Sequence, residues 1–450
     1  MRRINKRIVD NCNSWVMCML LGIFISSLTH ASDIADAAMV GDFEQVDVLI
    51  SQGIDVNEPQ VDGNTALHWA ARFDDLDMAS RLMTAGADVA AVNRVLAPPM
   101  LLAAINGSAE MIKLFLDHGA DPNAPLSQTG DTPLMIAART GLAEAVTVLL
   151  DANADVNTRE SWGGGTALMY AVSEGHRNVA AILIQEGAEV DARTAFIPRN
   201  TGRGLRFEGL PPRARLPDEI GPQIHTSGEM TPLLITAREG HLDTVRLMIE
   251  SDADINARAA DGKDALSLAI YNGNYAVASL LVDSGADLNQ ADAMGFTALF
   301  WAVDRRNMET APNFPWIITE DPLPLVRQLL DAGADPNIII NETPKALMRE
   351  GSPRIVFATA LMRAAFSGDP ELVRLLLEYG ADPFIRSSED ETTLGAAAGL
   401  GFIDGFHKAR PLTERLEVVR ILVELGLDVN WHDDYGITPL MTAANLGDLG

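Results

Sequence analysis

The chain has 450 residues, with 34 Lys and Arg against 62 Asp and Glu, a net charge of −28 at pH 7. This acidic balance argues against nucleic acid and anionic membrane surfaces as partners, because both require a basic protein surface. The only two cysteines, Cys12 and Cys18, lie close to the N-terminus, so the rest of the chain has no disulfide, no thiolate nucleophile and no cysteine metal ligand.

Residues 1–31 have the pattern of a secretory signal peptide. Four basic residues lie within the first seven positions, an apolar run follows over residues 15–28, and Ala31 is a small residue at the expected cleavage site. This run is too short for a membrane span, which needs about 20 residues. We therefore expect cleavage after Ala31, no membrane insertion of the mature protein, and an exported location, either periplasmic or secreted. Cleavage leaves 30 basic and 61 acidic residues, a net charge of −31.

A phrase ending in Gly-Ala-Asp recurs over residues 32–191 and again after residue 230. Its glycine position advances by 33 or 34 residues from Gly53 to Gly187, by 65 residues to Asp252, and then by 33 to 48 residues up to Gly426. Eight of the ten positions are Gly, and the other two are Asn153 and Asp252. Because these residue types tolerate a left-handed backbone, we predict that a helix ends at each of the ten positions.

The residues before each of these positions follow one register. Thr132-Pro133 begins a short first helix, because Thr caps a helix start and Pro suits the first helical position. Alanine pairs such as Ala137-Ala138 allow neighbouring helices to approach closely, and a turn glycine such as Gly141 ends the helix. A second helix carries paired apolar residues such as Leu149-Leu150. The unit closes with Asp155-Val156-Asn157, which we expect to hydrogen-bond its own turn.

This pattern resembles the ankyrin repeat, which has a 33-residue period and a Thr-Pro-Leu-His signature. Thr65-Ala66-Leu67-His68, Thr231-Pro232-Leu233-Leu234 and Thr438-Pro439-Leu440-Met441 carry the motif. The resemblance covers nearly all of residues 33–450, and the chain is similar to exported bacterial ankyrin-repeat proteins. It implies an all-α fold, an α-solenoid of helix-turn-helix units with β-hairpin finger loops, used to bind proteins. We expect repeats 1–5 over residues 32–191, and repeats 6–10 with a truncated eleventh over residues 230–450.

Residues 192–229 interrupt the repeats. They hold five Pro and five Gly among 38 residues and show no helical periodicity, so we predict a long loop insertion. Six Arg lie in this stretch, among them Arg203, Arg206 and Arg213. Two interpretations stay open. The segment is either a solvated arm, or its arginines bind carboxylates of the partner or of the protein's own acidic groove.

Alignment of the units places the exposed positions of fingers and first helices on one concave strip. A strip of ten units is on the order of 90 Å long, which suits a folded protein or a long segment better than a small substrate. Large residues stand on it outside the apolar register of their own repeats. We predict a partner-binding site made of Phe73, Trp162, Tyr271, Phe296, Phe366 and Tyr435, joined by Arg203, Arg206 and Arg213 of the insertion.

The sequence predicts no catalytic, cofactor-binding or metal-binding residue. It has no Gly-x-Ser-x-Gly elbow, no Walker loop and no Cys-x-x-Cys-His site. His68 and three further histidines stand at positions that the repeat explains, and the other histidines of the mature chain have no second His at helical spacing.

The function favoured by the sequence is a non-catalytic protein–protein interaction module or scaffold outside the cytoplasm, a monomer with an unidentified protein partner. The alternative is the recognition region of a larger enzyme or redox protein whose catalytic domain lies beyond residue 450. Thr438 starts a new first helix shortly before Gly450, which leaves this alternative open.

Overall fold

The computed structural model describes residues 33–196, 228–307, 320–340, 358–387, 390–399, 410–432 and 436–445. The chain divides into two compact units, residues 1–195 and 196–450. The described residues form α-helices joined by turns, and no β-strand occurs among them. The predicted signal peptide and most of the predicted 192–229 insertion lie outside the described residues.

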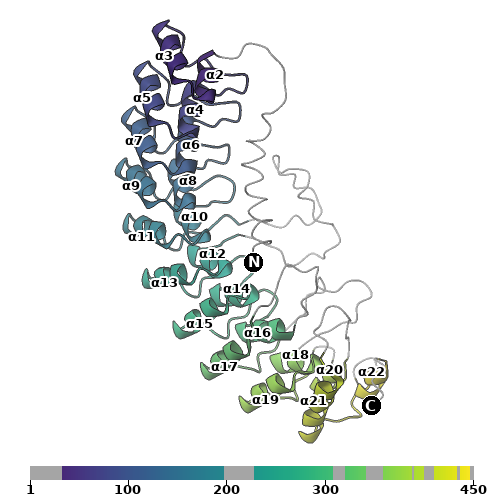
Figure 1. Ribbon diagram of the computed structural model, residues 1–450. Helices are drawn as coiled ribbons and strands as arrows, with labels where there is room; N and C mark the ends of the chain where they lie inside the picture. Colours follow the sequence, from purple (N-terminus) through teal and green to yellow (C-terminus); the bar gives the residue numbers. More distant parts are fainter. Residues whose placement is uncertain are drawn as a thin grey trace. The chain divides into compact units, whose positions relative to one another are not determined.

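The first unit is a stack of helix pairs in two rows (Figure 1). The first helices of successive pairs pack against one another, and the second helices form a parallel row beside them. The first helices are α2 (Asp33–Val40), α4 (Ala66–Arg72), α6 (Pro99–Asn106), α8 (Pro133–Thr140) and α10 (Ala167–Ser173). The second helices are α3 (Phe43–Ser51), α5 (Leu76–Thr84), α7 (Ala109–Asp117), α9 (Ala143–Asp151) and α11 (Arg177–Gln185).

The second unit repeats this arrangement. Its first helices are α12 (Pro232–Glu239), α14 (Ala265–Tyr271), α16 (Ala298–Asn307), α18 (Ala360–Phe366) and α20 (Thr393–Ala397), and the row ends with α22 (Pro439–Asn445). Its second helices are α13 (Leu242–Glu250), α15 (Tyr275–Asp283), α17 (Leu323–Asp331), α19 (Pro370–Glu378) and α21 (Leu412–Glu424). The helical repeat fold expected from the sequence is therefore confirmed.

The first helices begin and pack as their sequences predict. The hydroxyl of Thr132 accepts a hydrogen bond from the backbone N–H of Met135 at 3.4 Å, and Thr231 caps α12 in the same way. The alanine pairs lie at the contacts between neighbouring first helices, where a small side chain permits a close approach. All of them are completely buried: Ala70, Ala71, Ala103, Ala104, Ala137, Ala138, Ala364 and Ala365.

The ten helix ends predicted from the Gly, Asn and Asp positions are confirmed. Their φ angles lie between 60° at Asp252 and 100° at Gly333, in the left-handed region. A Cβ atom added at Gly119 or Gly285 would have no atom within 4 Å. Glycine is therefore required at these two positions by the backbone conformation and not by crowding.

Hydrogen bonds of asparagine side chains join successive repeats. Asp155 accepts the N–H of Asn157 at 3.0 Å, which confirms the predicted turn. The side chain of Asn157 then donates to the carbonyl of Gly187 at 3.0 Å and accepts the N–H of Glu189 at 2.9 Å. We call this pair of bonds an asparagine bridge. Asn57, Asn123 and Asn337 make equivalent bridges to the repeats that follow them.

Candidate functional site

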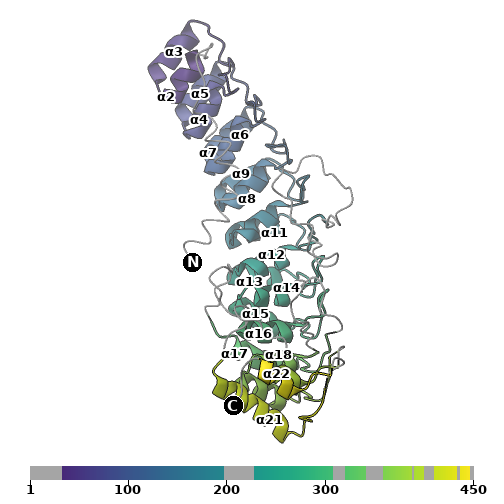
Figure 2. The same ribbon diagram turned by 90° about the vertical axis from the view of Figure 1, so that its right-hand side faces the viewer.

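The finger loops between repeats are tight turns closed by backbone hydrogen bonds. Gln60 donates its N–H to the carbonyl of Asn64 at 2.8 Å, a hairpin-type bond. The tips are also bonded to their neighbours, since the N–H of Ser161 donates to the carbonyl of Thr129 at 2.7 Å. In Figure 2 the fingers of the first unit follow one another along one edge of the helix stack. They form a row of fixed tips beside the first helices.

The tip of the fourth finger holds Trp162 in a fixed, exposed position. Trp162 is 67% exposed, one of the most exposed large apolar side chains among the described residues. The carboxylate of Glu160, only 7% exposed, lies beneath it. It accepts the backbone N–H groups of Trp162 at 2.6 Å, Gly163 at 2.7 Å and Gly165 at 2.9 Å. Three charge-assisted bonds thus fix the loop, so Trp162 loses little conformational freedom when a partner covers it.

The tip of the second finger carries Leu96 in an unusual conformation. Its φ is 63°, in the left-handed region, whereas the other tips of this unit have glycine at the equivalent position: Gly63, Gly130 and Gly164. A branched side chain in this region costs about 1–2 kcal/mol. Leu96 nevertheless points an apolar side chain into solvent, with 50% of it exposed.

The first helix α4 presents an aromatic pair with an arginine. Phe73 stacks on Trp69 with ring centroids 5.9 Å apart, and the guanidinium of Arg72 lies 5.5 Å from the Trp69 ring. Trp69 is largely buried and donates its indole N–H to Gln60 at 2.8 Å. Phe73 is 54% exposed. The exposure that the sequence predicts for Phe73 and Trp162 is therefore confirmed, while their binding of a partner stays a prediction.

A second arginine–aromatic pair joins α8 and α10. The guanidinium of Arg139 lies 5.8 Å from the ring of Tyr170, whose hydroxyl donates to Asp131 at 3.0 Å. Burial, followed by the neighbouring charge of Asp131, raises the pKa of Tyr170. Burial also acts to raise the pKa of Asp131, but hydrogen bonds from Ser127, Thr129 and Tyr170 outweigh it and lower that pKa. Tyr170 thus stays neutral and keeps the base of the third finger in place.

In the second unit the corresponding aromatic residues are packed together. The ring of Trp301, on α16, meets Tyr271 and Phe296 edge-on, each at 5.0 Å between centroids. The ammonium of Lys263 lies 5.7 Å from the Tyr271 ring and 5.6 Å from the Trp301 ring. Lys263 also pairs with Asp261 at 2.9 Å. The Lys263 ammonium therefore has both its aromatic and its carboxylate partners within this unit.

The prediction that Phe296 lies exposed on the binding strip is wrong. Phe296 is 8% exposed, stacks on Phe300 at 4.6 Å and closes its finger through a backbone bond with Asp292. Tyr271 is only half-buried. The rings of Phe300 and Trp301, on the helix of the same repeat that directly follows, pack against Phe296 and leave it buried.

The prediction that Phe366 lies exposed on the binding strip is also wrong. Phe366 is 2% exposed and belongs to a core cluster with Met362 and Ala396. The guanidinium of Arg363 lies 5.8 Å from its ring and pairs with Asp304 at 2.7 Å. Arg363 stands where other first helices carry an apolar or aromatic residue, and this buried charge covers the ring.

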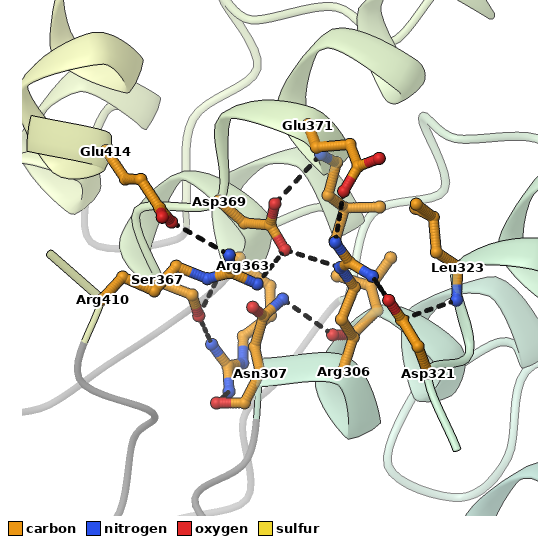
Figure 3. Close-up of polar contacts among 12 residues, drawn as sticks. Arg306, Asn307, Asp321, Leu323, Arg363, Ser367, Asp369, Glu371, Arg410 and Glu414 are labelled. Carbon is orange, nitrogen blue, oxygen red and sulfur yellow. Dashed lines mark hydrogen bonds and ion pairs between the residues drawn. The ribbon is translucent and has the colours of Figure 1, made fainter.

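A cluster of buried charges joins four segments of the second unit (Figure 3). The fully buried carboxylate of Asp369 accepts a bond from Arg306 at 2.7 Å and another from Arg410. Arg306 also pairs with Glu371 at 2.7 Å and with Asp321. Burial acts to lower the pKa of Arg306, but its bonds with Asp321 and Asp369 outweigh burial and raise that pKa. Both arginines are paired with carboxylates of the cluster itself, so we assign the cluster to stability and not to ligand binding.

The remaining predicted site residues lie outside the described residues. They are Arg203, Arg206, Arg213 and Tyr435. Of the predicted set, the structure brings Phe73 and Trp162 onto the finger and first-helix side of one unit. The sequence interpretation missed Leu96 and its exposed neighbour Val95. The available signal was a leucine at a finger tip where aligned repeats carry glycine.

Over the described residues, no three or more His, Cys, Asp or Glu side chains are grouped so that they could hold a metal ion. None of the described helices combines the length and the apolar composition that a membrane span requires.

Comparisons with known proteins agree with this architecture. The family described as ankyrin repeats (3 copies) matches residues 100–194, 216–292, 233–312 and 361–449, and the family described as ankyrin repeats (many copies) matches residues 34–83. These matches cover more than half of the sequence. The chain belongs to the ankyrin-repeat family.

The similar curated proteins match only in part. Human palmitoyltransferase ZDHHC13 is 36% identical over 91 residues, which is 20% of this chain and 15% of that protein. Zygote-specific protein 3 of Chlamydomonas reinhardtii is 42% identical over 79 residues, 18% of this chain and 21% of that protein. Human ankyrin repeat and SOCS box protein 3 is 31% identical over 113 residues, 20% and 21% of the two chains. The matched regions thus span about a fifth or less of these relatives.

Among solved structures, the human ASB11 ankyrin repeat domain is similar at 24% identity with a TM-score of 0.45. The match covers 57% of this chain and 99% of that one.

Proposed function

We propose that this protein binds a partner protein through the finger tips and first helices of its first unit. Ankyrin repeats are protein–protein interaction modules, and the exposed aromatic side chains of the first unit support this choice of surface. The observation that carries the proposal is Trp162, 67% exposed on a tip whose backbone is held by the carboxylate of Glu160. Exposed aromatic side chains on rigid supports are the residue type that dominates protein interfaces.

Phe73 supports the same surface from α4. It is the exposed member of a stacked pair, with Arg72 over the buried member. Aromatic and arginine side chains are both enriched at interface hot spots, and an aromatic ring buries a large area for few rotatable bonds. On sequence grounds alone, we propose that Arg203, Arg206, Arg213 and Tyr435 of the second unit also contact a partner.

The proposed binding is tested by site-specific photo-crosslinking in the full-length protein. A benzophenone amino acid replaces Trp162 or Phe73 in two separate variants. The control carries it at Val48, a 44% exposed residue of α3 in the row of second helices. We expect the same partner protein to be crosslinked from positions 162 and 73 and not from position 48. Equal crosslinking from all three positions, or none from 162 and 73, would contradict the proposed surface.

We further propose that the protein acts outside the cytoplasm and is not an enzyme. The support is the leader pattern of residues 1–31 and the absence of catalytic motifs in the sequence. N-terminal sequencing of the mature protein from cell fractions tests the location, with Ser32 expected as the first residue. An unprocessed N-terminus would overturn it.

A second proposal follows from the similarity to part of a palmitoyltransferase. In that case the repeats form the recognition region of a larger enzyme. A catalytic domain encoded after residue 450 would favour this proposal, and a stop codon after one further helix would favour a free-standing interaction module.

A further inference from the structure

The tip of the second finger exposes apolar side chains in a conformation that folding alone does not favour. Leu96 is 50% exposed and Val95 is 42% exposed. Leu96 has the left-handed φ that glycine adopts in the neighbouring fingers. A glycine at this position would remove both the strain and the exposed leucine side chain. An unfavourable residue that the fold nevertheless maintains points to a role in function.

Hydrogen bonds around Asn93 hold this tip in place. Its side-chain oxygen accepts the N–H groups of Val95 and Ala97, both at 3.0 Å. Its side-chain nitrogen donates to Asn64 of the preceding finger at 3.0 Å. The N–H of Arg94 donates to the carbonyl of Asp62 at 2.9 Å. The strained leucine is therefore fixed before any partner arrives, which lowers the entropic cost of burying it.

Two exposed arginines of the first unit suit an acidic partner. Arg94 on the tip and Arg72 on α4 are both exposed, and neither forms an ion pair with any described residue. This contrasts with the chain as a whole, in which acidic residues outnumber basic ones 62 to 34. Arginine that lacks a carboxylate within an acidic protein is available to carboxylates of a partner.

We propose that the tip formed by Arg94, Val95 and Leu96 is a docking point for a protein segment that carries an apolar side chain flanked by carboxylates. Leu96 and Val95 would cover the apolar side chain, and Arg94 would pair with a carboxylate. This inference rests on the proposed function and adds the chemistry of the segment recognised.

The test uses the full-length protein and a phage-displayed library of random 16-residue peptides as the probe. We expect the enriched peptides to combine Asp or Glu with a neighbouring large apolar residue. The strongest peptide is then synthesised and titrated against the parent and four variants: Leu96→Gly, Arg94→Gln, Trp162→Ala and Asn153→Gly. Asn153→Gly is the matched control, because it also removes a non-glycine residue from a left-handed position, with φ of 65°, but at a helix end away from the fingers.

Leu96→Gly should weaken peptide binding about tenfold or more while leaving the urea midpoint unchanged or raised. Arg94→Gln should weaken binding and flatten its dependence on salt. Asn153→Gly should bind as the parent does. Such a separation of affinity from stability is not expected of a residue that serves only the fold.

Two results would overturn the inference. One is a library that enriches no peptide, or only peptides without carboxylates. The other is unchanged peptide affinity in Leu96→Gly. If Trp162→Ala alone abolishes binding, the second finger is not the docking point but the proposed surface stands. If no variant changes peptide affinity and no partner crosslinks from position 162, the proposed function fails as well.

Discussion

The two units share one repeat but use its first-helix side differently. In the first unit Phe73 and Trp162 extend into solvent, and Arg72 and Arg94 have no ion pair with a described residue. In the second unit Phe366 is buried beneath Arg363, which pairs with Asp304. The same scaffold thus leaves aromatic and arginine residues exposed in one unit, where we propose recognition, and packs them inside the other. The position of a residue in the repeat does not by itself decide whether its side chain is exposed or buried.

The largest contrast between the units should appear at the caps of their second helices. Asp369 caps α19 and pairs with buried Arg306 and Arg410, whereas Asp75 caps α5 by accepting the N–H of Met78 at 3.0 Å. Asp369→Ala should cost about 3–5 kcal/mol, because it removes the buried carboxylate that Arg306 and Arg410 share. Asp75→Ala should cost about 1 kcal/mol, the ordinary value of a helix cap.

Urea unfolding measures both costs. Asp369→Asn separates cap from charge, because asparagine caps a helix well but cannot neutralise arginine. A loss of only about 1 kcal/mol in Asp369→Ala would show that the buried pairs add nothing to the cap.

Removal of one phenylalanine from each unit sharpens the same contrast. Phe366→Ala should destabilise the protein by about 3–5 kcal/mol, since it opens a cavity in the core. Phe73→Ala should change stability by no more than about 0.5 kcal/mol, because its ring is mainly in solvent. Thermal or urea melts give both values. Similar losses for the two variants would mean that Phe73 supports the fold and is not free to bind.

Helix ends should behave alike in the two units. Gly119→Val and Gly285→Val should each cost about 1–2 kcal/mol, because both positions are left-handed and neither is crowded. The measurement is urea unfolding. A variant as stable as the parent would refute the requirement for a left-handed residue. Unequal losses of unfolding free energy in the two variants would show that the units differ at their helix ends too.

The smallest effect concerns pH in the first unit. The N–H of Thr65 donates to Nδ1 of His68 at 3.1 Å, so Nδ1 is unprotonated and Nε2 donates to the carbonyl of Ala97 at 2.9 Å. Burial lowers the pKa of His68 below its usual 6.5. The unfolded chain therefore binds the proton first as pH falls, and stability is lost below about pH 6.5 by at most about 1.4 kcal/mol per pH unit.

The free energy of unfolding of the parent and of His68→Gln is measured between pH 7.5 and 5. The difference between the two isolates the contribution of His68, because the other titrating groups contribute equally to both. The stability advantage of the parent should shrink as pH falls. An advantage that is constant with pH would show that His68 does not titrate in this range.

Features set by local sequence were predictable, and those set by distant neighbours were not. The cap at Thr132, the left-handed glycine at Gly285 and the Asp155-Val156-Asn157 turn depend on residues within a few positions, so one repeat is enough to infer them. The burial of Phe366 depends on Arg363 and its partner Asp304, 59 residues away in the sequence. No sequence pattern within one repeat predicts such a contact between distant segments.

Local signals predicted the candidate surface only in part. Trp162 was found because it breaks the apolar register of its own repeat, which is a local signal. Phe296 breaks it too, yet packs against Phe300 and Trp301 and is buried. Leu96 has a local signal too, a leucine where the neighbouring fingers carry glycine. Apolar spacing does not reveal it, because the signal lies in the backbone conformation of the tip.

The asparagine bridges have a consequence for how the stack comes apart. In repeat arrays, cooperativity of unfolding depends on the coupling between nearest neighbours. Ala90 stands where Asn57 and Asn123 make their bridges, so the boundary after the second repeat lacks two hydrogen bonds, worth about 1–3 kcal/mol of coupling. The two N-terminal repeats, which include the Arg94–Leu96 tip, can therefore open as a separate cooperative segment while the following repeats stay folded.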